Sequence, residues 1–251
     1  MPAAYDTYDY PSYWEGRDYE HKSEVIALKS FLEKIKSIDT ILDIGAGYGR
    51  LSPLYLFRSK KIILSDPSAK LLKIARNISI SKKVKYIQSK LENLNSKIKK
   101  GSVDVILLIR VLHHIKDLDE AFFTFNRLIK KGGYLILEYP NKKHLKATFL
   151  QLFKGNITFP FDIFPKDLRS KKSIRKNDLP FVNYHPDFIK ELLKNYGFKI
   201  VESRSVSNIR SPYLKKKIPL EVLLFFEKYL QNILSYINFG PSIFILAKKY
   251  K

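Results

Sequence analysis

The sequence predicts an α/β fold built around a doubly wound parallel sheet. Along residues 40–140, short apolar runs of strand length alternate with segments whose apolar residues recur at helical spacing. The most apolar run, residues 102–109, has the composition of a strand that is covered on both faces. A glycine-rich turn follows the first run, which is typical of a strand that passes into a helix beside a bound ligand.

The predicted elements follow in a regular order up to residue 140. Residues 21–36 have apolar residues at helical spacing and predict a first, amphipathic helix. After it we expect strand 40–44, helix 50–59, strand 61–64, helix 68–80, strand 84–88, strand 102–109, helix 119–130 and strand 134–139.

Residues 141–184 break this rhythm. They are rich in phenylalanine, hold three prolines and include the basic run 166–176, so we interpret them as an inserted cap that forms the substrate region. The alternation then resumes with helix 186–196, strand 198–203, helix 220–238 and strand 243–248. We expect a single domain over residues 1–251, with residues 1–38 as an N-terminal lid and helix.

Composition excludes several function classes. The 251 residues include no cysteine, which removes disulfides, thiolate metal sites and enzymes that attack a pyrimidine ring through a thiolate. The formal net charge is +22, but 36 of the 46 basic residues are lysine. Proteins that recognise phosphate groups of nucleic acids favour arginine instead. Nucleic acid is therefore the less favoured partner. The N-terminus resembles no signal peptide and no apolar run is long enough for a membrane span, which predicts a cytoplasmic protein.

The segment 41–50 is the most informative stretch. Three glycines, Gly45, Gly47 and Gly49, separate a strand from a helix and let the backbone approach a ligand closely. The nicotinamide and flavin fingerprint would require a further glycine where this chain has Arg50. Asp43 at the strand end would repel a pyrophosphate and suits a ligand that carries positive charge.

A second acid, Asp66, ends the next strand. A carboxylate in this place can bind the two vicinal hydroxyls of a ribose. The alternative is that Asp66 simply caps the helix that begins near Ser68. Because Asp66 follows Asp43 and three glycines, we favour the role in ligand binding.

At these residues the chain resembles the class I S-adenosylmethionine-dependent methyltransferases, particularly the type-11 group, which acts mostly on small molecules. Four matches carry the resemblance in order: the glycine turn, residues 65–68, residues 104–115 and residues 126–139. The resemblance implies a Rossmann-like sheet of about seven strands, mostly parallel with an antiparallel last strand. It also implies S-adenosyl-L-methionine as the cofactor.

The resemblance assigns roles residue by residue. It implies that the glycine turn and Asp43 hold the methionine end of the cofactor, that Asp66 binds the ribose, and that Pro67 and Ser68 flank the adenine. The family often has an acid near the adenine amino group where this chain has Lys90, so the backbone of Leu91, or Glu92, would replace it. The predicted cofactor-binding residues are Asp43, Gly45, Ala46, Gly47, Gly49, Asp66, Pro67, Lys90, Leu91, Ile109, Tyr13 and Arg17.

The N-terminal residues 5–20 are dense in aromatic side chains and hold the chain's single tryptophan. In relatives such a segment forms a lid over the cofactor, with Tyr13, Arg17 and Tyr19 as the expected contacts. The alternative is a tail that packs on the edge of the domain. The tryptophan favours the lid.

Methyl transfer from a sulfonium mainly requires that the two reactants be positioned, and a base is needed only when the acceptor arrives protonated. Candidate bases are His113 and His114, of which at least one is expected to be structural. His185 is interpreted as a neighbour of the following helix N-terminus. Residues 109–112 lack the Asn/Asp-Pro-Pro-Tyr motif of enzymes that methylate amino groups of adenine or glutamine. Arg110 could reach an acidic substrate or pair with a surface carboxylate.

Two further features bear on the acceptor. The basic run 166–176 fits RNA phosphates or a solvated face equally well. Residues 214–238 join three lysines to an apolar helix, which fits a core or dimer helix, or contact with a membrane surface. We predict an enzyme that methylates a small or lipid-linked molecule, with peripheral membrane contact through 214–238. The alternatives are an RNA or protein methyltransferase and a non-catalytic cofactor-binding protein.

Overall fold

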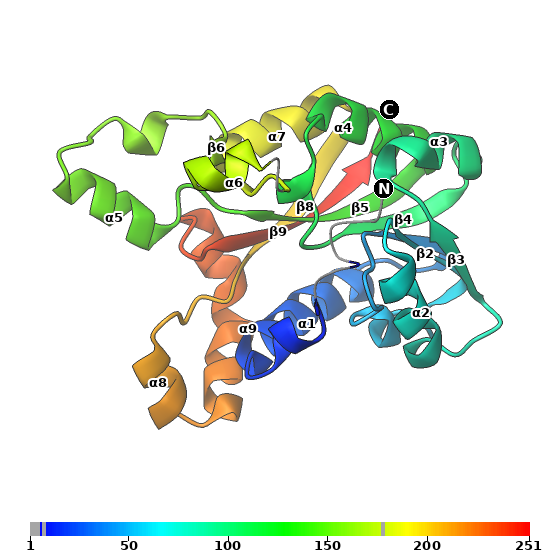
Figure 1. Ribbon diagram of the computed structural model, residues 1–251, viewed down its shortest axis with the longest axis horizontal. Coiled ribbons are helices and arrows are strands. Elements are labelled where there is room, and N and C mark those ends of the chain that lie inside the picture. The colour runs from blue at the N-terminus through cyan, green and yellow to red at the C-terminus, as the bar shows by residue number, and fades with distance from the viewer. Residues whose placement is uncertain (1–5, 7–8, 177–178) are drawn as a thin grey trace.

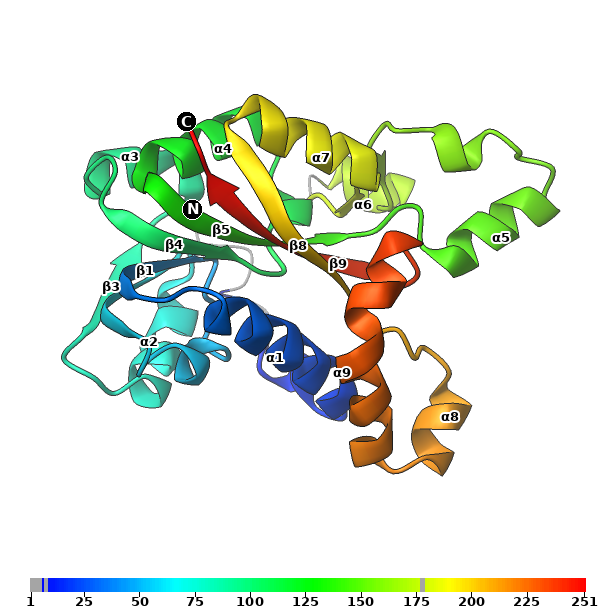
Figure 2. The same ribbon diagram turned by 180° about the vertical axis from the view of Figure 1, so that it is seen from behind.

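The computed structural model describes residue 6 and residues 9–176 and 179–251. A sheet with strand order β3-β2-β1-β4-β5-β9-β8 runs through the molecule, with helices on both faces (Figures 1 and 2). Strands β1 to β5 pair in parallel, and β9 is antiparallel to both of its neighbours. The predicted fold class, seven strands with an antiparallel last strand, is confirmed.

The strands of this sheet are β1 (Ile38–Ile44), β2 (Ser59–Asp66), β3 (Val84–Gln88), β4 (Val103–Leu108), β5 (Ile129–Pro140), β8 (Phe198–Val206) and β9 (Ser242–Lys249). The helices that flank it are α1 (Asp18–Glu33), α2 (Ala69–Ile78), α3 (Leu94–Lys97), α4 (Leu118–Leu128), α7 (Pro186–Asn195) and α9 (Leu220–Tyr236). No helix within the described ranges is both long and apolar enough to span a lipid bilayer.

Strand β4 shows why the sheet is buried on both faces. Its side chains alternate between two hydrophobic clusters: Val105 and Leu107 join one, and Ile106 and Leu108 join the other. All four are fully buried. A two-residue period with apolar residues on both faces gives the uninterrupted apolar run that the sequence shows.

Two predicted elements differ from the structure. Residues 50–59, expected as a helix, form turns and one short 3-10 segment (Ser52–Leu54), because Pro53 lacks an N–H and the connection to β2 is short. Strand β5 begins at Ile129 and includes Gly133. A Cβ on Gly133 would lie 2.8 Å from the carbonyl oxygen of Asp104, so glycine allows the strand to pass close to β4.

The segment between β5 and α7 projects from the sheet on the side where α8 (Pro212–Lys217) also lies (Figure 1). It contains α5 (Leu145–Phe153), α6 (Lys171–Arg175) and the short antiparallel pair β6 (Lys166–Asp167) and β7 (Val182–Asn183). We keep the name cap for residues 141–184; that it covers the acceptor stays a prediction.

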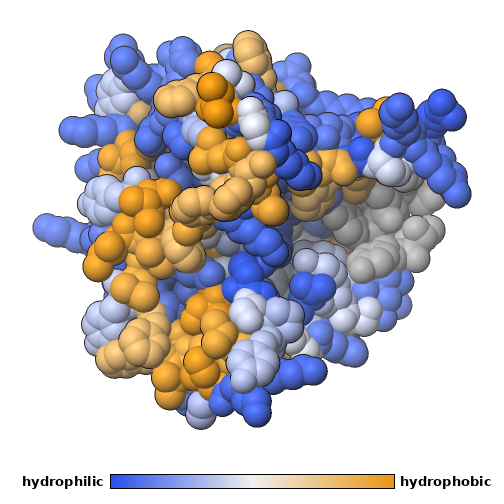
Figure 3. Space-filling model, turned by 90° about the vertical axis from the view of Figure 1, so that its left-hand side faces the viewer, coloured by the Kyte–Doolittle hydropathy of each residue, from blue (hydrophilic) through white to orange (hydrophobic). Residues whose placement is uncertain are grey.

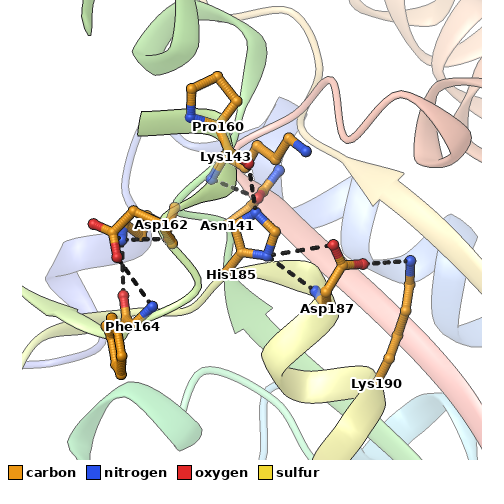
Figure 4. Close-up of polar contacts among 9 residues, drawn as sticks. Asn141, Lys143, Pro160, Asp162, Phe164, His185, Asp187 and Lys190 are labelled. Atoms are coloured by element: carbon orange, nitrogen blue, oxygen red, sulfur yellow. Dashed lines mark hydrogen bonds and ion pairs between the residues drawn. The ribbon is translucent and has the colours of Figure 1, made fainter. Parts of the chain in front are cut away.

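Buried polar side chains tie the cap to the sheet (Figure 4). The Lys142 ammonium, which is almost fully buried, donates to the carbonyls of Asp162 and Phe164 at 2.7 and 2.8 Å and pairs with the Asp162 carboxylate at 2.6 Å. On the other side of this segment, His185 Nε2 lies 3.1 Å from the Pro160 carbonyl. Cap residues 160–164 are therefore held by two side chains from the ends of β5 and α7.

Candidate functional site

The glycine turn lies directly after β1, at the carboxyl edge of the parallel strands. The N–H groups of Gly45 and Ala46 both donate to the Ser65 carbonyl, at 2.8 and 3.1 Å. Gly45 has φ 69°, and a Cβ on it would lie 2.3 Å from Val111 Cγ2. The turn thus needs glycine for its conformation and for its packing, and its backbone can approach a ligand with no side chain between them.

Asp66 braces this turn from the end of β2. One carboxylate oxygen accepts the N–H of Gly47 at 2.9 Å, and the other accepts the N–H of Ser68 at 2.8 Å. The cap of α2 is Ser68 itself, whose hydroxyl accepts from Leu71, so the simple N-cap explanation of Asp66 is wrong. Burial raises the pKa of Asp66 to about 6, although both backbone hydrogen bonds oppose the rise.

Asp43 is more deeply enclosed. Its carboxylate accepts a hydrogen bond from the hydroxyl of Tyr55, and burial raises its pKa to about 7 against the opposing effect of that hydrogen bond. Two neighbouring carboxylates with raised pKa values make a site that a cationic or hydroxyl-bearing ligand would stabilise.

On the expected adenine side, Pro67 follows Asp66 and its carbonyl accepts from the Gln88 amide at 3.3 Å. Lys90 is exposed, and the Leu91 side chain is buried in the core, which leaves its backbone for a ligand. Glu92 is exposed, and Ile109, after β4, is buried in the second hydrophobic cluster. These residues therefore lie at the ends of β2, β3 and β4, and their contacts with the adenine stay predictions.

The N-terminal segment runs along the glycine turn and the residues that follow β2. Ser68 Oγ donates to the Asp6 carboxylate at 2.5 Å, and carbons of the Tyr10 ring lie 3.8 Å from where a Cβ on Gly47 would be. Burial raises the pKa of Tyr10 to about 12. Further along, the guanidinium of Arg50 lies 3.5 Å from the centre of the Trp14 ring. The segment therefore packs against the glycine turn and the start of α2; that it forms a lid over the cofactor stays a prediction.

Glu24, a buried carboxylate on α1, binds the two arginines, Arg50 and Arg110, that lie beside the Trp14 ring. Glu24 is 1% exposed; it accepts from Arg110 Nε at 2.6 Å and from the guanidinium of Arg50. Burial disfavours the charged carboxylate, but the charges and hydrogen bonds of the two arginines outweigh it and lower the pKa of Glu24. Arg110, with φ 61°, therefore pairs with a buried carboxylate and not with the surface carboxylate considered from the sequence.

A cavity of about 1290 Å³ opens beside the N-terminal segment. Of the predicted site residues, it brings together Tyr13, Arg17, His113 and His114. Tyr10 lines it too and stands between it and Gly47. Tyr19, predicted as a third lid contact, instead lies buried and donates to Glu227 of α9.

The two histidines after β4 differ in their surroundings. His114 Nδ1 lies 2.6 Å from the Pro180 carbonyl and so carries a hydrogen toward it. His113 is 6% exposed, its ring centre lies 3.9 Å from that of His114, and its Nδ1 has no hydrogen-bond partner among the described residues. Burial lowers the pKa of His113 well below its usual value, so the ring is neutral near pH 7. The same burial that keeps the His113 ring neutral disfavours its protonation.

Several polar residues of the cavity wall were missed from the sequence, among them Glu138, Asn183 and Ser207. Glu138 at the end of β5 is 2% exposed; it accepts from the Arg110 N–H at 2.8 Å and from the Ser242 hydroxyl. Asn183 Oδ1 and Ser207 Oγ are buried, line the cavity and have no partner within the described part of the chain. Glu138 could have been found as an acid at the end of an apolar strand, but no local signal marks Asn183 or Ser207.

His185 is not part of this cavity's lining. It caps α7: its Nδ1 accepts the N–H of Asp187 at 3.2 Å, so its Nε2 carries the hydrogen that is donated to Pro160 (Figure 4). The interpretation of His185 as a helix-terminus residue is confirmed.

The family model described as a methyltransferase domain matches residues 13–203, which include β1 to β5, the cap and the N-terminal segment from residue 13 onward. This chain belongs to the methyltransferase domain family. The predicted class of enzyme, a methyltransferase dependent on S-adenosylmethionine, is thereby confirmed at the level of the family.

Relatives agree with this assignment. The ubiquinone/menaquinone biosynthesis C-methyltransferase UbiE of Escherichia coli is 27% identical over 180 residues, which are 65% of this chain and 67% of that protein. A structure assigned as an S-adenosylmethionine-dependent methyltransferase from Listeria monocytogenes superposes with a TM-score of 0.65 at 19% identity, covering 93% of this chain and 99% of that one. One from Archaeoglobus fulgidus gives 0.59 at 19% identity, covering 96% and 100%.

Proposed function

We propose that this methyltransferase transfers the methyl group of S-adenosylmethionine directly to a small or lipid-linked acceptor bound in the cavity beside the lid. The observation that carries the proposal is that a glycine turn, two buried carboxylates and a neutral His113, whose Nδ1 has no hydrogen-bond partner among the described residues, lie at one edge of the sheet. The name of the Escherichia coli relative, a ubiquinone/menaquinone biosynthesis C-methyltransferase, supports carbon as the acceptor atom.

The residues present fit the cofactor. The backbone at Gly45 and Gly47 can approach a ligand, Asp66 can accept from ribose hydroxyls, and the buried hydroxyl of Ser65 has no partner within the described residues. Asp43 and Asp66 both have raised pKa values, so a cationic ligand would favour their ionised forms. Tyr10 would have to adjust, because its ring lies against Gly47.

S-adenosylmethionine, when bound, supplies an electrophilic methyl group and a neutral thioether leaving group. The chain's own residues position the acceptor and exclude water: the lid closes one side of the cavity and Phe181 packs on His113, with 4.8 Å between ring centres. Where the acceptor carries a proton, the candidate bases are His113 and His114, which both line the cavity.

Cofactor binding tests the proposal first. Replacing Asp66 with asparagine removes a carboxylate that would accept from the ribose, and we expect the dissociation constant for S-adenosylmethionine to rise roughly 10- to 100-fold, as for the loss of a charged hydrogen-bond partner. Isothermal titration calorimetry measures this change. Asp39→Asn is the matched control, since Asp39 lies at the start of β1, at the opposite edge of the sheet, where it pairs with Lys60 at 2.8 Å.

Two results would contradict the proposal. Wild-type protein that binds no S-adenosylmethionine would remove the cofactor assignment, and an Asp66→Asn variant that melts like the wild type and binds equally well would remove the role of Asp66. An RNA acceptor would be indicated if acceptor binding weakened steeply with added salt, because phosphate contacts release counterions.

A further inference from the structure

Helix α9 is turned with its polar side chains toward the protein. Glu227 and Gln231 are 1% and 0% exposed, whereas Phe225, Tyr229 and Ile233 are 59%, 58% and 62% exposed. The buried side is held by specific hydrogen bonds, since the Glu227 carboxylate accepts from the Tyr19 hydroxyl and from the N–H of Ser207 at 2.7 Å. The aromatic side of α9 therefore faces outward because of how the helix is anchored.

The cap has the same character. Helix α5 buries none of its residues, and Phe153 and Phe149 are 86% and 51% exposed. Beyond it, Phe161 and Phe164 are 80% and 74% exposed. Scattered single apolar residues are ordinary on a protein surface, but clusters of this size on two neighbouring projections mark an interaction surface.

Both projections lie on one side of the molecule (Figures 1 and 2). Figure 3 views that side and shows apolar side chains gathered in several patches with hydrophilic ones around them. Lys216 and Lys217 of α8 are exposed here. Residues 141–176 contain ten basic and two acidic side chains, of which only Lys142 is buried.

Charge decides which partner fits this surface. The buried centre of a protein–protein interface is depleted in lysine, whereas exposed lysines beside aromatic and aliphatic side chains suit anionic headgroups and the acyl boundary beneath them. No described helix could cross the bilayer, so the surface would lie on the membrane and not within it.

We propose that the outward sides of α5, α8 and α9 form a docking face for an anionic lipid bilayer. We define the docking face by Phe149 and Phe153 of α5, Lys216 and Lys217 of α8, and Phe225 and Tyr229 of α9. The cavity is lined by His144, which caps α5, and by Pro212 and Lys215 of α8. Docking therefore brings the cavity beside the bilayer, where a lipid-linked acceptor resides.

The test uses the whole chain and vesicle flotation without cofactor or acceptor. We expect binding to vesicles of phosphatidylcholine with phosphatidylglycerol, and weak binding to phosphatidylcholine alone. The variant Phe225→Gln/Tyr229→Gln should reduce the bound fraction on anionic vesicles by roughly tenfold, and Lys216→Glu/Lys217→Glu should reduce it and weaken its dependence on salt. Phe57→Gln is the matched control, because Phe57 is 76% exposed but lies between β1 and β2, away from the docking face.

Two outcomes would overturn the docking face: no binding to anionic vesicles, or equal loss of binding in the control and the Phe225→Gln/Tyr229→Gln variant. Sedimentation velocity without vesicles adds a third. A wild-type dimer that this variant converts to a monomer, with no vesicle binding by either, would show that a second copy covers this face. Because vesicle binding needs no cofactor, none of these results bears on the methyl-transfer proposal.

Discussion

Helices α4 and α9 each carry a pair of adjacent phenylalanines, and they use them in opposite ways. In α4, Phe122 is fully buried and Phe123 is half exposed, as expected of an amphipathic helix on a sheet. In α9, Phe225 and Phe226 are both more than half exposed, while Glu227 beside them is buried. The same local sequence pattern thus covers the core in one region and forms the surface in the other.

The difference lies in what each helix has to hold. Helix α4 contributes Phe122 and Phe125 to a continuous hydrophobic cluster under β4 and β5. Helix α9 instead provides the Glu227 carboxylate, which fixes the loop after β8, and the Gln231 amide, which donates to the Ser23 carbonyl of α1; from that loop Ser207 enters the cavity wall. Its buried polar residues hold this loop and α1 in place, and its aromatic side is exposed.

The largest expected effect comes from the same substitution in both helices. Phe122→Ala should cost about 3–5 kcal/mol in the free energy of unfolding, because it leaves a cavity in the core. Phe225→Ala should change that free energy by less than about 0.5 kcal/mol, since its side chain is already in water. Urea denaturation measures both. Similar losses in the two variants would show that α9 packs more tightly than its exposure indicates and would break the comparison.

A smaller effect tests the buried side of α9. Glu227→Gln keeps the side chain's size but replaces one of the two acceptor oxygens with a donor NH2, which then faces the N–H of either Ser207 or Asn208. We expect a loss of about 1–3 kcal/mol in the free energy of unfolding. Glu221→Gln, at an exposed position in the first turn of the same helix, should stay within about 0.5 kcal/mol of the wild type. If both variants unfold alike, the anchoring role of Glu227 is wrong.

Sequence reasoning predicts the α4 region well. Strands such as β4 pack against an apolar cluster on each face, so they appear in the sequence as uninterrupted apolar runs. Sequence reasoning also predicts Asp43 and Asp66 as a pair, since both lie at the ends of neighbouring parallel strands. It predicts an apolar helix at residues 220–238 but not its orientation. Glu227 meets Tyr19, 208 positions earlier, and no local pattern reports a contact of that span.

The ion pairs that join Glu24 to Arg50 and Arg110 were not predicted, for the same reason. The three residues lie on α1, after the glycine turn and after β4, and they meet only once α1 has packed against the sheet. The expected helix at 50–59 failed on a local cause, because Pro53 limits the segment to a short 3-10 turn. Long-range polar contacts and proline account for most of what the pattern did not predict.

The smallest expected effect concerns how firmly the cap is held, and it depends on pH. Burial lowers the pKa of His185 below its usual 6.5, while the Pro160 carbonyl and Asp187 oppose the fall and Lys143 and Lys142 add to it. The folded chain then binds fewer protons than the unfolded chain, so this contribution to stability is complete above about pH 6.5 and is lost as pH falls through the lowered pKa.

Protonation would also place a hydrogen on His185 Nδ1, which now accepts the N–H of Asp187. Hydrogen exchange of cap residues 160–164 should therefore quicken by roughly two- to fivefold between pH 7.5 and 5.5 after correction for intrinsic rates. In His185→Asn the side-chain oxygen can still cap α7 but does not titrate, so the pH dependence should disappear while α7 remains protected. Equal pH dependence in the two proteins would assign the loosening to another group, and the attachment of the cap would then rest on Lys142 alone.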